Sequence, residues 1–426
     1  MNVTFTPSVK NGDNSNGRGG ARAPGALLWY LGLTVAVGGA VVGLLRLLDI
    51  LWVGHYHKVL IPLSILAAVL LIKAKGRLRV DGLSLCLFLA LPLGTVVGIL
   101  HGGAARQTLS HFGAALFAFT VYTAARLTIP HAEWLKEFWR RASYLILFSY
   151  GLSIAAFWII GAVTGRALYL GIGTGDVMFA FCYFIVHRMR FATILCAVVI
   201  ILSGKRGTLL AMLVTLLYSV RLPFLRGFYV RSIFALGAGV GFIFATFYFR
   251  EAIMGVGLPS ALSSVLDKWY QVDPFAETFD IDLAVSGRNL ELSLAFGKFA
   301  QQSHHWLVGM GFGWSYFFDA RIAGSETTDF FSHYVHFSPA NYVLLHGAPL
   351  ALVTLFLMLR VIAIGYRTAK ANTTDGKMQR VLALFCISAF VSSLSGYMYA
   401  TDPFYWICFG TLSSTRIWKS YGRVSD

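Results

Sequence analysis

The stretch "GLSLCLFLALPLGTVVGIL", residues 82–100, decides the fold class of this chain. It has no charged side chain and is close to the ~20 residues that a helix needs to cross a bilayer. Similar runs recur along the sequence, so that hydrophobic residues make up 57% of the 426 and charged residues only 13%. The mean hydropathy is +0.68. Because a soluble chain of this length needs more charge to cover its surface, the sequence predicts an all-α polytopic membrane protein.

The apolar runs divide the chain into tails, two groups of spans and one long loop. Residues 1–26 are polar and rich in Gly and Asn, which is typical of a disordered tail and not of a signal peptide. A long loop is expected at 250–339 and a short tail at 419–426. Nine spans are predicted within 27–249 and three within 340–418, namely 27–47, 58–72, 82–100, 109–127, 142–164, 167–186, 191–204, 207–220, 231–249, 340–363, 379–399 and 403–418.

The basic residues orient these spans. Of the 35 Lys and Arg, 24 lie in one alternate set of connections, which includes Arg79, Arg126, Arg141 and Arg360. The positive-inside rule makes this set cytoplasmic. Both termini are then cytoplasmic and the 250–339 loop is outside. Spans seven and eight are short, and the "SGKRG" between them could instead enter the membrane from outside without changing the side of any later loop. The net charge of +16 is thus explained by topology, and no nucleic-acid partner is expected.

The five cysteines all lie inside apolar runs and lack CxxC spacing. We expect them to be buried as small hydrophobic residues, with no disulfide framework.

The outer loop contains the segment "SGRNLELSLAFGKFAQQ". Ser286 is a plausible N-cap, and Leu290, Leu294 and Gly297 recur at helical spacing, which predicts an amphipathic helix on the membrane surface. Arg288 would then lie in the first turn, where a cation opposes the helix dipole unless an anion joins it.

Alternating glycines follow in "HHWLVGMGFGW", at Gly309, Gly311 and Gly313. No βαβ unit surrounds them, so they are not a dinucleotide-binding fingerprint. The spacing instead predicts close backbone approach to a partner or a ligand.

Three cations are predicted on the outer side, which otherwise avoids basic residues: Lys205, Arg206 and Arg288. Cations near lipid usually face a cavity or an anionic partner. The alternative is that they reach toward lipid phosphates, which is common for single interfacial cations. The two readings are about equally supported by the residues alone.

His336 stands out among the three histidines of "SHYVHFSPANYVLLHG" (332–347). Ser338 and Pro339 predict a helix start, with Ser338 as N-cap. A helix N-terminus disfavours an imidazolium, and a neutral imidazole can take a proton from a hydroxyl. His333 and His346 are interpreted as ordinary structural histidines, as His336 itself also could be.

Two carboxylate features complete the candidates. Asp176 is an unusual acid within span six, and the sequence names no partner for it. The Asp280–Asp282 pair has the DxD spacing of metal-dependent sugar transferases, but such a match arises often by chance in an acidic loop. We therefore expect no metal and no cofactor.

The order of these motifs resembles the superfamily of O-antigen ligases and Wzy-type polysaccharide polymerases. The resemblance rests on Ser203–Gly207 (S-x-x-R-G), Ser286–Arg288 (SGR), Gly309–Trp314 (GxGxGW), and His336 placed eleven residues before Gly347. It covers about 200–352 by motif and the whole chain by topology.

The resemblance implies a metal-independent, inverting GT-C glycosyltransferase of the bacterial inner membrane with a periplasmic active site. Arg206 and Arg288 would hold the diphosphate of an undecaprenyl-diphosphate-linked glycan donor, and His336 would activate the acceptor hydroxyl of a glycan or of lipid A–core. Lys205 joins this group on charge alone. A chain-length regulator is a possible further partner.

Three functions remain open. Phe337 and Leu350 depart from the pattern of ligases, which favours a polymerase of lipid-linked repeat units over a ligase. A transporter or flippase of lipid-linked sugar is a more distant alternative, because no inverted repeat is visible and the unusual cations collect on one side.

Overall fold

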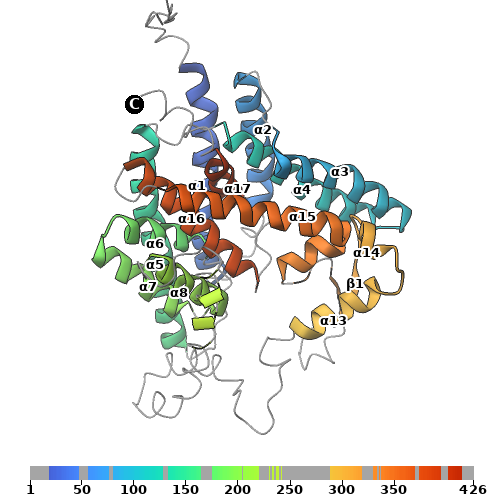
Figure 1. Ribbon diagram of the computed structural model, residues 1–426. Helices are drawn as coiled ribbons and strands as arrows, with labels where there is room; N and C mark the ends of the chain where they lie inside the picture. Colours follow the sequence, from blue (N-terminus) through green and yellow to red (C-terminus); the bar gives the residue numbers. More distant parts are fainter. Residues whose placement is uncertain are drawn as a thin grey trace, which may run out of the picture.

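The computed structural model describes residues 19–47, 56–75, 80–127, 133–164, 175–203, 205–219, 288–318, 330–332, 335, 337–369, 374–394 and 402–414, with a few helical residues between 230 and 241. This part of the chain is overwhelmingly α-helical (Figure 1). Within the described residues, one antiparallel pair of three-residue strands joins Tyr316 with Ser332 and Phe318 with Phe330. The all-α membrane architecture that the sequence predicts therefore agrees with the structure.

The elements follow one another along the chain without a soluble domain among the described residues. In order they are α1 (Gly19–Leu47), α2 (Tyr56–Lys75), α3 (Gly82–Leu100), α4 (Ala105–Ala125), α5 (Glu133–Thr164), α6 (Val177–Val186), α7 (Arg190–Leu202), α8 (Arg206–Ser219), α13 (Arg288–Phe299), α14 (His305–Val308), β1 (Tyr316–Phe318), β2 (Phe330–Ser332), α15 (Ser338–Thr368), α16 (Thr374–Ser393) and α17 (Pro403–Ser413).

Four of these helices are long and apolar enough to cross a membrane, over Gly25–Leu45, Gly82–Leu100, Trp134–Ile160 and Ser338–Thr368, and shorter apolar helices accompany them. Each predicted span overlaps a helix where the structure describes it, but 167–186 does so only from Val177, and 231–249 lies largely outside the described residues. The total of twelve crossings stays a prediction.

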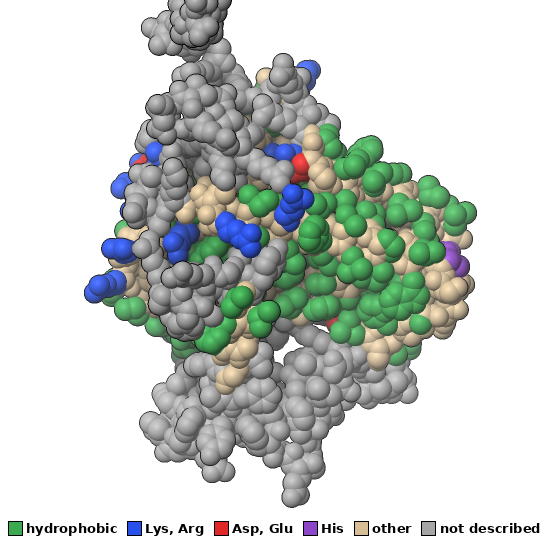
Figure 2. Space-filling view, in the orientation of Figure 1, with side chains coloured by type: hydrophobic (Ala, Val, Ile, Leu, Met, Phe, Trp, Pro, Cys, Tyr) green, Lys and Arg blue, Asp and Glu red, His purple; other side chains and the backbone are tan. Residues whose placement is uncertain are grey.

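One part of the outward surface of the described bundle is apolar. Side chains such as Phe88, Ile99, Phe148 and Leu352 are at least half exposed. Figure 2 shows hydrophobic side chains covering the face over α3, α4 and α15, whereas the Lys and Arg side chains gather away from it. Such a surface suits contact with lipid tails.

Aromatic packing joins the helices in the centre of the bundle. The ring of Phe179 in α6 lies 4.9 Å from Phe404 in α17 and 5.5 Å from Phe385 in α16, while Trp29 of α1 packs edge-on against Phe404. All five cysteines are free and buried, which confirms that prediction. Asp176 precedes α6 and has a partner that the sequence did not reveal, because the Tyr150 hydroxyl donates to its carboxylate over 3.2 Å.

Contacts of α8 with α15 and α16 bring particular helix ends together. Tyr366 near the end of α15 donates its hydroxyl to the carbonyl of Tyr218 near the end of α8 (2.8 Å). Ser392 near the end of α16 donates to the carbonyl of Gly207 at the start of α8 (3.5 Å). The end of α8 therefore lies beside the end of α15, and the start of α8 lies beside the end of α16.

One local prediction needs correction. The helix begins at Ser338 itself, so the N-cap is Phe337 and not Ser338. In α13, Glu291, Ala295 and Phe299 are buried within the protein, whereas Leu294 is half-buried and Gly297 is exposed. Phe299 and Ala295 pack in a small cluster with the glycine-rich turn and α15, which decides the helix face.

Candidate functional site

A break in α15 organises the predicted site region. Gly347 has φ +76° and ψ 164°, outside helical geometry, and Pro349 follows it. Proline has no N–H to donate to the residue four positions earlier, which is Leu345. The Leu344 carbonyl is freed by the break as well, so two backbone acceptors need partners from elsewhere.

The glycine-rich turn supplies these partners. Met310 N–H donates to the carbonyl of Leu344 (2.7 Å) and Gly311 N–H to that of Leu345 (3.2 Å). The fit is equally close on the side of α15, because a Cβ added at Gly347 would collide with the backbone of Leu307. The turn is thus docked into the break of α15, which fits the rule that irregular backbone at membrane depth must be buried in protein.

The other face of the turn docks on α3 and α4. Phe312 N–H donates to the carbonyl of Gly94 in α3 (2.7 Å), and Gly313 N–H donates to Nδ1 of His111 in α4 (3.0 Å). A Cβ on Gly311 would overlap the backbone at Gly98, so this position requires glycine. The predicted close approach is therefore confirmed, and the partner is the protein itself.

All N–H groups from Gly309 to Gly313 are used in this docking, since Gly309 N–H donates to the carbonyl of His305 (2.7 Å). An anion-binding nest needs free backbone N–H groups. We conclude that the three glycines support the site and do not cradle a phosphate.

A small cavity of about 60 Å³ lies beside the turn, between α3, α4 and the first half of α15. Its polar lining comes from His111, Ser338, Asn341, Tyr342 and His346. This volume accommodates a few waters or one small group, not a sugar chain.

His346 is the unusual member of this lining. Its side chain is 4% exposed, and its Nδ1 is buried with no hydrogen-bond partner among the described residues. The ring edge of Phe312 packs against it, with ring centroids 5.6 Å apart. The sequence reading left His346 as a structural histidine, and only the packing reveals the unsatisfied nitrogen.

Asn341 fixes the backbone just before His336. Its Oδ1 accepts from the N–H of Val335 (3.0 Å), and its Nδ2 donates to the carbonyl of the same residue. Val335 is fully buried and Asn341 is 3% exposed. His336 lies outside the described residues, but both of its neighbours are held at the start of α15. Sequence reasoning missed Asn341, although its position three residues after Ser338 was a visible polar feature of an apolar helix.

The predicted cations begin helices. Arg206 is the first residue of α8 and Arg288 the first residue of α13, but their side chains lie outside the description. Lys205 is half-buried just before α8. In α13, Glu291 in the first turn supplies a negative charge near the helix start and accepts from the hydroxyl of Tyr316 (3.1 Å). Asp280, Asp282 and His333 are outside the described residues.

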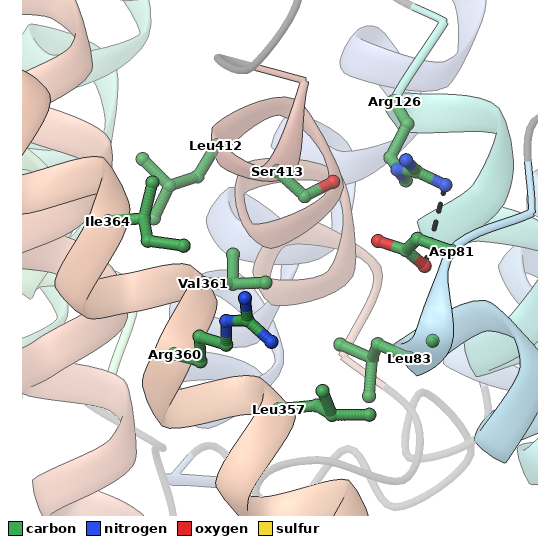
Figure 3. A pocket seen from close by; sticks show the side chains of 10 residues that line it. Asp81, Leu83, Arg126, Leu357, Arg360, Val361, Ile364, Leu412 and Ser413 are labelled. Carbon is green, nitrogen blue, oxygen red and sulfur yellow. Dashed lines mark ion pairs between the residues drawn. The ribbon is translucent and has the colours of Figure 1, made fainter.

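A second cavity, of about 160 Å³, lies where α3, α4, α15 and α17 meet (Figure 3). Asp81 and Arg126 form an ion pair across 3.4 Å at its edge, and Arg360 lines it from α15. The charge pattern of the sequence predicts that these three residues lie on the cytoplasmic side, away from the predicted active site.

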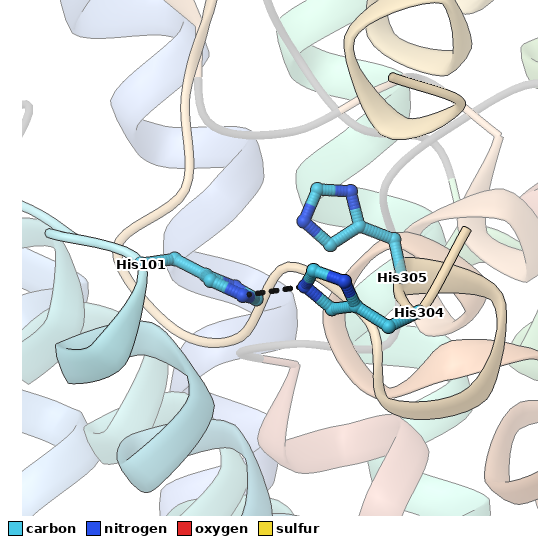
Figure 4. Close-up of side chains that lie close together, drawn as sticks. All are labelled: His101, His304 and His305. Carbon is cyan, nitrogen blue, oxygen red and sulfur yellow. Dashed lines mark hydrogen bonds between the residues drawn. The ribbon is translucent and has the colours of Figure 1, made fainter. Parts of the chain in front are cut away.

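Three histidines that the sequence analysis did not single out also meet near the turn (Figure 4). His101 follows α3, whereas His304 and His305 begin α14. Burial lowers the pKa of His305, and the nearby His101, His304 and Lys298 lower it further, against a backbone hydrogen bond that raises it. The adjacent pair "HH" was the only sequence signal, because its third member is about 200 positions away.

No protein-family model and no curated protein matches this sequence. The family resemblance therefore rests on the motifs themselves.

Proposed function

We propose that this protein is an inverting, metal-independent membrane glycosyltransferase that polymerises undecaprenyl-diphosphate-linked repeat units on the outer face of the bacterial inner membrane. One observation supports this most: α8, which begins with Arg206, packs on α16, and α16 in turn packs on α15, whose start adjoins His336. The helix α13, which begins with Arg288, packs against α15 and β1. Three motif residues far apart in sequence are thus attached to elements that are linked in the fold.

In the proposed reaction, the acceptor hydroxyl attacks the anomeric carbon of the donor sugar. Its proton passes to His336, and the bond between the sugar and the diphosphate breaks with its electron pair leaving on the diphosphate. Arg206 and Arg288 stabilise the charge that develops on this leaving group, since guanidinium groups pair with phosphate oxygens in a fixed geometry. Lys205 adds positive charge.

The test uses purified protein in liposomes with a lipid-linked repeat unit as sole substrate. A polymerase gives a ladder of products. A chain that reacts only after lipid A–core is added is a ligase, and one that moves the lipid-linked sugar across the bilayer without a covalent product is a transporter.

Arg206→Ala and Arg288→Ala are each expected to lower the polymerisation rate by about 10²–10³-fold, the usual effect of removing one group that stabilises transition-state charge. Arg141→Ala is the matched control, because Arg141 is exposed and predicted cytoplasmic, and it should leave the rate unchanged. Normal chain lengths in both arginine variants would refute the proposed diphosphate contacts.

The proposed chemistry uses no divalent cation. The rate without Mg²⁺ and Mn²⁺ is therefore expected to equal the rate with them. A rate that depends on either ion would instead bring the Asp280 and Asp282 pair back as its ligands.

A further inference from the structure

We propose that His101, His304 and His305 form a binding site for a divalent transition-metal ion, with Zn²⁺ as the preferred ion. One ring nitrogen from each histidine lies within 4.8 Å of the other two. The Nε2 atoms of His101 and His304 are 3.0 Å apart (Figure 4). In a tetrahedral zinc site with Zn–N bonds of about 2.0–2.1 Å, two ligand nitrogens are roughly 3.3 Å apart, so small side-chain adjustments complete the site.

Backbone carbonyls already orient two of the rings. The Nδ1 of His305 is 2.8 Å from the carbonyl of Phe299, and the Nδ1 of His101 is 3.4 Å from that of Met310. Carbonyl oxygens only accept, so each Nδ1 carries the proton and each Nε2 keeps its lone pair. This is the arrangement by which metal-binding histidines are held, with the second nitrogen bonded to a carbonyl.

His304 completes the set by changing its tautomer. Its Nε2 must donate to the lone pair of His101 Nε2 for the 3.0 Å contact to be a hydrogen bond. Moving that proton to Nδ1 of His304 gives a third lone pair, and no net proton needs to leave the site.

The burial pattern leaves a coordination position and an entry path. His305 is 7% exposed, whereas His101 and His304 are exposed. An ion held by three imidazoles would therefore keep a fourth position open to solvent for water. Imidazole nitrogens suit Zn²⁺ and its neighbours in the first transition row, and among the described residues the group consists of histidines without the carboxylates that Mg²⁺ and Ca²⁺ prefer.

The ion would join two elements that meet at the glycine-rich turn. Two ligands come from the start of α14, which leads directly into Gly309, and the third follows the last turn of α3. Metal binding would thus fasten the turn to α3, in addition to the bond from Phe312 N–H to Gly94. The three histidines are separate from the residues proposed for glycosyl transfer, so the metal site does not depend on that function.

The test measures zinc on the full-length protein, purified without a histidine tag and stripped with a chelator. After equilibration with Zn²⁺, the wild type is expected to hold one zinc per chain by mass spectrometry. Zn²⁺ should raise its Tm, because an ion that binds only the folded state stabilises it. Co²⁺ in place of zinc should give the visible absorption of a tetrahedral site.

His101→Gln and His304→Gln remove exposed ligands and should fold normally. Each is expected to lower zinc affinity by more than about 100-fold, since loss of an outer-sphere partner alone costs 10–100-fold. His187→Gln is the control, because His187 stacks on Tyr183 in α6 outside the group, and it should keep the full zinc content.

Zinc uptake by the wild type that does not exceed that of the His101→Gln/His304→Gln double variant would overturn the proposal. Both readouts are taken without any glycan substrate, so they stand whether or not the protein makes polymer.

Discussion

At the residue scale, Gly311 is the tightest point of the docked turn. Its φ is +75°, and an added Cβ would overlap the backbone of α3 at Gly98. A left-handed conformation costs about 1–2 kcal/mol for a residue with a Cβ, and overpacking adds about 1–3 kcal/mol. Gly311→Ala is therefore expected to lower the free energy of unfolding by about 2–5 kcal/mol, measured by thermal unfolding in detergent.

Gly297→Ala provides the comparison for this change. Gly297 is exposed within α13, and no atom lies within 4 Å of its added Cβ. Alanine favours a helix by about 0.8–1.0 kcal/mol over glycine, so this variant should be neutral or slightly stabilising. Equal Tm values for the two variants would contradict the docking of Gly311 against α3.

The sequence could predict that the alternating glycines approach another backbone, because the residue type itself implies it. It could not identify the partners. Gly98 is more than 200 positions from Gly311, and the freed carbonyls of α15 depend on a break at Gly347 that only the fold reveals. The same holds for His346 and for the group of His101 with His304, whose significance arises from contacts between distant segments.

At the element scale, Asp81 determines where α3 begins. Its Oδ1 accepts from the N–H of Ser84 (2.8 Å), its Oδ2 accepts from the hydroxyl of Tyr122 (3.0 Å), and Arg126 pairs with it. One carboxylate thus caps α3 and ties it to α4. Asp81→Ala should destabilise the protein by about 1–3 kcal/mol, since it removes the cap of α3 and the acceptor of the buried Tyr122 hydroxyl.

Asp81→Asn keeps an oxygen for the cap and should cost less than Asp81→Ala in the same unfolding measurement. Glu137→Ala is the control for the loss of an ion pair. Glu137 pairs with Arg140 and Arg141 on an exposed surface, so its removal should leave the Tm unchanged. A loss of Tm in Glu137→Ala as large as in Asp81→Ala would show that the buried setting of Asp81 is unimportant.

The sequence predicted the helix positions well, because an apolar run long enough to span a bilayer has few alternatives to a helix in lipid. The predicted 82–100 run is α3 residue for residue, and the predicted helix after Ser286 is α13. The burial of Glu291 in α13 was not predicted, because the hydroxyl that donates to its carboxylate belongs to Tyr316, 25 positions away. Local periodicity cannot report such a contact.

At the scale of the whole molecule, two groups of residues gather at opposite ends of α3, and this arrangement is compatible with the topology inferred from charge. Asp81, Arg126 and Arg360, all predicted cytoplasmic, line one cavity. The glycine-rich turn of the predicted outer loop packs against the opposite end of α3. A chain with one span too many or too few between these segments would separate at least one of the two groups.

This topology predicts which positions a membrane-impermeant maleimide can reach in intact spheroplasts. All five native cysteines are buried, so the wild type should stay unlabelled. Arg106→Cys and Gln301→Cys change exposed positions on the predicted outer side and should label without permeabilisation. Arg141→Cys changes an exposed position on the predicted inner side and should label only after the membrane is opened.

The result separates the possible arrangements of the bundle. Labelling of Arg141→Cys alone in intact spheroplasts would invert the whole topology and place the glycine-rich turn in the cytoplasm. If only one of Arg106→Cys and Gln301→Cys labels, the true number of spans between α3 and α13 differs from the predicted number by an odd number. The hydrogen bond from Phe312 N–H to the Gly94 carbonyl argues against this result, because it holds the glycine-rich turn against α3. A donor carried by lipid on the outer leaflet can reach only a site that faces outward. The proposed polymerase therefore requires that Arg106→Cys and Gln301→Cys both label in intact spheroplasts, before the membrane is opened.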